Sequence, residues 1–192
     1  YLVTTSNGSF AKQASFTVYG ISLALLFLAS STYHFFDLGE RGNLFLRRGD
    51  HAAIFLLIGG TYYPAIVHLL DGNWRIGMLI GIGLVAVFGV FFKLTWFHAP
   101  RWIDAGMYLG MGWAIVIPGS QIYHAMTAAN LFWLGAGGAF YTVGAVIYAT
   151  KWPDPWPGKF GFHDVWHVFV LGGAACHFGF VLTLLEQPVP PF

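Results

Sequence analysis

The chain has 192 residues, of which 57% are hydrophobic and only 9% are charged, with a formal net charge of +1. A soluble domain usually has about a quarter charged residues, so this composition excludes an ordinary water-soluble protein. The sequence contains no basic run, and we therefore expect no nucleic-acid partner. A single cysteine, Cys176, excludes an intrachain disulfide.

The apolar runs are long enough to cross a bilayer, for which a helix needs about 20 residues. In chain order they predict six membrane spans, over residues 13–36, 50–70, 75–95, 101–119, 127–150 and 161–186. The predicted fold class is therefore an all-α integral membrane protein. We expect residues 1–192 to form a single transmembrane helical domain, a bundle of six helices.

The connections and small residues add detail to these spans. The segment "DLGERGNLFLRRG" (37–49) is predicted to be a polar loop between the first two spans. Pro64 and Pro118 should bend the second and fourth spans, which membrane bundles tolerate. Three prolines in "KWPDPWPGKF" (151–160) forbid a helix between the last two spans. The patches "GAGGAF" (135–140) and "LGGAA" (171–175) suit close helix contact.

The basic residues of the short loops predict the orientation of the chain. Seven of the nine fall on one side of the predicted bundle, which is therefore cytoplasmic: Arg41, Arg47, Arg48, Lys93, Arg101, Lys151 and Lys159. Six spans then leave both chain ends outside, where a chain without a signal peptide rarely begins. We expect a further helix before Tyr1, so that the full protein has seven spans.

Polar residues from three distant spans converge at one depth of this topology. Ser30 and His34 lie four residues apart, hence on one helix face, in the last inner turns of the first span. Asp50 is expected in the first inner turn of the second span. His163 and His167, also four apart, begin the sixth. At about 1.5 Å per residue, all five lie within roughly 10 Å of the cytoplasmic boundary.

This set suits a divalent metal. Three neutral imidazoles with one open position are typical of a catalytic zinc site, and His34, His163 and His167 are the predicted ligands. The ligand type favours zinc over copper or iron. Zinc brings the pKa of a water toward 7, and Asp50 is the natural acceptor of its proton. Ser30 would orient the water or a substrate carbonyl.

Simpler roles exist for several of these residues. Ser30 would commonly bond its own i−4 carbonyl, and Asp50 would stabilise a helix N-terminus beside Arg47 and Arg48. His51 resembles an interfacial histidine. Cys176 and His177 are interpreted as packed side chains, and Asp104 and Asp164 as helix caps or interfacial charges. The roles of His51, His124 and His177 stay open. The convergence of three histidines with a carboxylate favours the metal.

Three blocks of the sequence resemble the hemolysin III family: "SSTYHFF" (30–36), "LRRGDHAAIFLLIGGTYYP" (46–64) and "FGFHDVWHVFVLGGAACHF" (160–178). That family is the bacterial branch of the progestin and adiponectin receptor superfamily, with a more distant relation to alkaline ceramidases. The resemblance implies seven helices and a zinc ion near the cytoplasmic side. By motif, it implies His34, His163 and His167 as ligands, with Asp50 and Ser30 contacting the zinc-bound water.

Two functions follow as hypotheses. The first is a zinc-dependent hydrolase of a lipid amide or ester, such as a ceramide-like lipid, with a role in membrane homeostasis. The second is a non-catalytic membrane sensor or regulator with a structural zinc. A cytolytic pore and a proton relay through His34, Asp50 and His167 are weaker alternatives. We expect a bacterial cell membrane as the location and membrane lipids as partners, while protein partners stay open.

Overall fold

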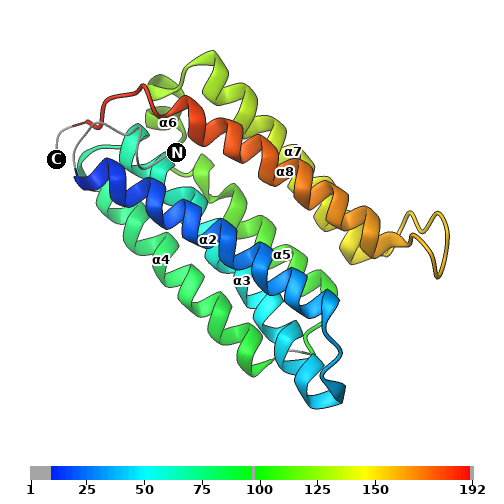
Figure 1. Ribbon diagram of the computed structural model, residues 1–192. Helices are drawn as coiled ribbons and strands as arrows, with labels where there is room; N and C mark the ends of the chain where they lie inside the picture. The colour runs from blue at the N-terminus through cyan, green and yellow to red at the C-terminus, as the bar shows by residue number, and fades with distance from the viewer. Residues whose placement is uncertain (1–9, 97, 191–192) are drawn as a thin grey trace. The chain divides into compact units, whose positions relative to one another are not determined.

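The computed structural model describes residues 10–96 and 98–190 (Figure 1). All the regular elements of this part of the chain longer than an isolated bridge are helices, in agreement with the predicted class. Its elements are α2 (Phe10–Phe35), α3 (Gly39–Leu69), α4 (Gly72–Thr95), α5 (Arg101–Trp113), the 3₁₀ helix η1 (Ala114–Val116), α6 (Gly119–Ala125), α7 (Ala128–Thr150) and α8 (Phe162–Thr183). Residues 1–9, and the helix expected before them, lie outside the described residues.

Within the described residues, five helices are long and apolar enough to cross a membrane: α2, α3, α4, α7 and α8. They correspond to five of the six predicted spans, and the chain is an integral membrane protein. The remaining span, 101–119, is divided into α5, η1 and α6. Pro118 has no N–H group, so it cannot donate the usual helical hydrogen bond to the Ala114 carbonyl. That carbonyl instead accepts from the Ile117 N–H at 3.1 Å in a 3₁₀ turn. That this segment crosses the membrane stays a prediction.

The predicted loop over residues 37–49 is wrong for most of its length, because α3 begins at Gly39. Polar side chains stabilise this start. The Asp37 carboxylate accepts from the Gly39 N–H at 3.1 Å, and the Asn43 side-chain oxygen accepts from the Leu38 N–H at 3.0 Å. These bonds satisfy amides that a helix start leaves without partners. Asp50 therefore lies about three turns inside α3, so the expected first-turn position and the helix N-terminus role are wrong.

The chain divides into two compact units. The first contains α2, α3 and α4, together with residues 187–190, and the second runs from Ala99 to Glu186. In the first unit, α3 packs against both α2 and α4 (Figure 1). Gly60 of α3 lies against Ser22, and Gly89 of α4 lies against the ring of Phe55. Small residues let these backbones approach closely. The single-domain organisation stays a prediction.

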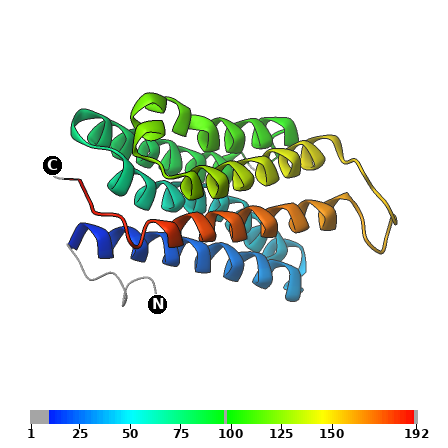
Figure 2. The same cartoon turned by 90° about the horizontal axis from the view of Figure 1, so that it is seen from above.

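In the second unit α8 packs along α7, and α7 also packs against α5 (Figure 2). Some glycines of both predicted patches lie at the α7–α8 contact. A Cβ placed on Gly173 would lie 2.8 Å from the ring of Tyr141, and Gly137 lies against the ring of His177. The proline-rich segment between the two helices contains no helix, as predicted.

Candidate metal centre

In the first unit, the end of α2 meets α3 through three polar side chains. The Ser30 hydroxyl donates a hydrogen bond to the Asp50 carboxyl, and His34 lies close enough to attract that carboxyl electrostatically. Arg47, about one turn before Asp50 on α3, attracts it as well. Asp50 is only 5% exposed, so its polar partners matter for stability. The predicted meeting of Ser30, His34 and Asp50 is therefore present within this unit.

In the second unit, His163 and His167 lie one helical turn apart at the start of α8. Their ring centroids are 4.5 Å apart with an interplanar angle of 87°. Trp166 lies between them in sequence, with its ring 5.1 Å from His163 and 4.7 Å from His167. Trp166 is itself buried against Tyr148, at 4.8 Å between centroids. This aromatic packing restricts the orientations of both imidazoles.

Three histidines, His34 of the first unit and His163 and His167 of the second, each offer one ring nitrogen and are candidates to hold a metal ion. They are called the three-histidine group below. The donor set fits a divalent transition metal, because neutral imidazole suits zinc, copper, iron and nickel. All three candidate ligands are nitrogen donors, and the Asp50 carboxyl lies close to one of them, His34. Three protein ligands would leave a position for water or substrate, as in catalytic zinc sites.

Two further histidines, His68 and His177, pack against aromatic rings in the described residues. His68, 3% exposed on α3, donates from Nδ1 to the Pro64 carbonyl at 2.9 Å and stacks on Phe16. His177 lies beside Tyr141 on α7, at 5.2 Å between ring centroids. His51 is 5% exposed, and its interfacial role stays a prediction. His124 is exposed on α6.

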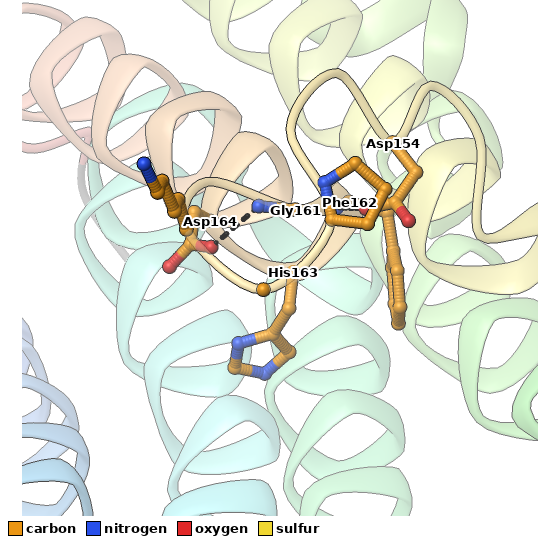
Figure 3. A pocket seen from close by; sticks show the side chains of 8 residues that line it. Asp154, Gly161, Phe162, His163 and Asp164 are labelled. Atoms are coloured by element: carbon orange, nitrogen blue, oxygen red, sulfur yellow. Dashed lines mark hydrogen bonds between the residues drawn. The ribbon is translucent and has the colours of Figure 1, made fainter.

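The loop between α7 and α8 adds a feature that the sequence did not predict. It forms a cavity of about 310 Å³ whose lining includes Asp154, Lys159, His163 and Asp164 (Figure 3). The Asp164 carboxylate accepts from the Gly161 N–H at 2.8 Å, which confirms its predicted capping role, and Asp154 accepts from the Phe162 N–H at 2.8 Å. One metal-ligand candidate thus borders a cavity that has charged side chains in its lining. The three prolines indicated a loop but not its shape.

Comparison with known proteins agrees with the resemblance of the three sequence blocks. Residues 1–178 match the family described as Haemolysin-III related. The chain belongs to this family. It is 36% identical to Hemolysin-3 of Bacillus cereus, over 93% of this chain and 78% of that protein. It is 34% identical to the Hemolysin-3 homolog of Bacillus subtilis (strain 168), over 91% of this chain and 79% of that protein.

The similarity extends to eukaryotic proteins named for seven helices or for a receptor. Heptahelical transmembrane protein 4 of Arabidopsis thaliana is 31% identical, with 83% of this chain and 46% of that protein covered. The Adiponectin receptor protein of Drosophila melanogaster is 30% identical, with 72% of this chain and 35% of that protein covered. The haemolysin-III chain described here therefore has heptahelical relatives in addition to the bacterial ones.

Proposed function

We propose that this haemolysin-III protein is a zinc-dependent membrane hydrolase that cleaves a lipid amide or ester, with a role in membrane homeostasis. The observation that carries the proposal is the buried Asp50 carboxyl, hydrogen-bonded to Ser30 and close to His34. A purely structural zinc is usually enclosed by four protein ligands, whereas a catalytic zinc keeps an open position. Three histidines beside a carboxylate match the second arrangement.

When bound, zinc supplies Lewis acidity to a substrate carbonyl and makes a water nucleophilic at neutral pH. Asp50 then accepts the proton that the attacking water loses as its oxygen bonds to the carbonyl carbon. The carbon–nitrogen or carbon–oxygen bond of the lipid breaks, and Asp50 returns the proton to the leaving amine or alkoxide. Ser30 holds the Asp50 carboxyl in place by donating its hydroxyl hydrogen.

The substrate class follows from the environment of these residues. His34 lies in the last turn of α2 and His163 in the first turn of α8, both on helices able to cross a membrane. Basic residues near these helix ends, Arg41 at the start of α3 and Lys159 in the α7–α8 loop, favour the cytoplasmic side for them. A lipid would therefore reach the site from the bilayer or its inner leaflet. The Bacillus relatives support a bacterial cell membrane as the location.

Metal content and lipid turnover test the proposal together. We expect one zinc per purified wild-type chain, and none in His163→Ala. Incubation with a panel of ceramide-like amides and acyl esters should give a hydrolysis product that chelation abolishes. Asp50→Asn should keep zinc but lose turnover, because the amide cannot take up the proton. Zinc-independent turnover, or full turnover by Asp50→Asn, would contradict the hydrolase.

A non-catalytic regulator with a structural zinc is the second candidate. Its supporting observation is that the three histidines belong to two separate units, with His34 in the first and His163 and His167 in the second. A metal held by all three would tie α2 to α8. In that case His34→Ala should lower the stability of the helical bundle. Asp50→Ala should retain zinc and should support wild-type growth of a deletion strain under membrane stress.

A further inference from the structure

The cavity in the α7–α8 loop of the second unit borders the proposed metal site but has no part in the proposed chemistry. It has a volume of about 310 Å³, and His163 is part of its lining (Figure 3). The lysines Lys151 and Lys159 place this loop on the cytoplasmic side by the positive-inside rule. The cavity is therefore bordered by water-side residues and by one proposed metal ligand.

The charge of the lining favours a cation over an anion. A helix N-terminus ordinarily attracts anions through its free N–H groups. At α8, however, the Gly161 and Phe162 N–H groups already donate to Asp164 and Asp154, both at 2.8 Å. Gly161 allows this arrangement, because a Cβ there would lie 2.7 Å from Asp154 Oδ1. The cavity is left with two carboxylates and one cationic side chain, Lys159.

We propose that this cavity is the route by which a hydrated divalent cation reaches the histidines from the cytoplasm, with Asp154 and Asp164 attracting it and His163 receiving it first. The proposal rests on the zinc site proposed above. Carboxylates in a cleft raise the local concentration of cations and their association rates. His163 borders the cavity in the first turn of α8, and His167 lies one turn further along the helix.

The test measures the rate of metal uptake separately from the amount bound. Detergent-purified protein is stripped with a chelator and mixed with excess Co²⁺, whose visible absorption reports tetrahedral binding. The variant Asp154→Asn/Asp164→Asn keeps oxygen acceptors for the two capping bonds and removes both charges. We expect its uptake rate at 20 mM salt to be about fivefold or more below that of the wild type, with the same final occupancy.

Two comparison variants sharpen the test. Lys159→Gln removes the positive charge of the lining and should speed uptake about twofold, with no effect on either cap. Glu186→Gln removes an exposed carboxylate of the same unit beyond the far end of α8. Glu186 lies about 30 Å from the cavity along the axis of α8, well beyond the roughly 10 Å screening length at 0.1 M salt. The metal uptake rate of Glu186→Gln at 0.1 M salt should therefore equal that of the wild type.

Salt and equilibrium measurements distinguish an access route from other roles. The effect of the double Asp→Asn variant should nearly disappear at 0.5 M salt, because the attraction acts through water. Unchanged uptake at low salt would overturn the route while leaving the zinc site intact. A lower final occupancy in that variant would also overturn it, because the carboxylates would then hold the metal at equilibrium. Absence of Co²⁺ binding by the wild type would instead remove the proposed function and this inference together.

Discussion

The Ser30 hydroxyl on α2 donates a hydrogen bond to the Asp50 carboxyl on α3. The two residues are 20 positions apart in the sequence and come from different helices. Asp50 is 5% exposed, and a buried carboxyl is stable only when its oxygens have partners. The bond fixes Asp50 beside His34, where the proposed chemistry needs a proton acceptor of defined orientation.

The first prediction concerns Ser30→Ala, which removes this bond and leaves residue Asp50 unsubstituted. We expect lipid turnover to fall about 10- to 100-fold, the usual effect of losing a residue that orients a metal-site group. Zinc content should stay near one per chain. Ser30→Thr restores a hydroxyl and should recover much of the activity.

The adjacent Ser31 provides a matched control for this prediction. It is exposed on the same helix, so Ser31→Ala should leave turnover unchanged. Loss of zinc in Ser30→Ala would contradict a role confined to Asp50. Equal turnover in Ser30→Ala and the wild type would show that the hydrogen bond does not matter for the reaction.

Removal of the metal is the second prediction. A ligand bound only by the folded state stabilises it by about 4 kcal/mol when present at 1,000 times its Kd. For a chain of this size, about 1 kcal/mol corresponds to roughly 2–4 °C in Tm. We therefore expect excess chelator to lower the wild-type Tm by about 10 °C, as measured by thermal unfolding in detergent. His167→Ala should show the Tm of the metal-free wild type both with and without chelator.

His124→Ala is the control for metal removal. His124 is exposed on α6 and is not a member of the three-histidine group. The variant should bind one zinc and respond to chelator as the wild type does. A chelator effect that persists in His167→Ala would place the stabilising metal elsewhere.

Hydropathy predicted most of the fold because five spans are continuous apolar helices. It failed at the start of α3 because residues 39–49 are polar and charged yet helical. The bonds of Asp37 and Asn43 that support this start are visible only once the backbone turns at Gly39, where φ is 72°. It also could not foresee the 3₁₀ turn at Ala114–Val116, because Pro118 indicates a disturbance without specifying its form.

More of the candidate site than of the loops around it could be predicted from the sequence. Helical spacing places Ser30 with His34, and His163 with His167, because residues four apart share a face. The distribution of basic residues predicts that the helix ends that carry them lie on one side of the membrane. The cavity beside His163 could not be predicted, because its shape depends on how Asp154 and Asp164 fold back onto the first amides of α8.

The third prediction concerns the α7–α8 contact. Gly173→Ala adds a methyl group where a Cβ would lie 2.8 Å from the Tyr141 ring. Overpacking of this kind costs about 1–3 kcal/mol, and Tm in detergent should fall. Gly135→Ala is the control, because nothing lies within 4 Å of a Cβ at that position. There, alanine should leave stability unchanged or raise it by up to about 1 kcal/mol. The same sign of change in both variants would contradict the close contact.

The fourth prediction concerns Asn130, which is fully buried at the start of α7. Its side-chain oxygen accepts from the Thr127 N–H at 2.8 Å, and its amide nitrogen donates to the Thr183 hydroxyl on α8. Asn130→Ala removes both bonds and should lower stability by about 1–3 kcal/mol. Thr183→Val removes the bond between the helices and the bond from the Thr183 hydroxyl to the Phe180 carbonyl of the same helix, while it leaves the bond at Thr127. It should cost less, about 1 kcal/mol.

Denaturation of the purified variants by heat measures this difference. Thr95→Val is the control, since the Thr95 hydroxyl is exposed and bonds only to carbonyls of its own helix α4, and its Tm should match that of the wild type. If Thr183→Val were as damaging as Asn130→Ala, the capping bond at Thr127 would add nothing. In that case the start of α7 would depend on its contact with α8 rather than on its own cap.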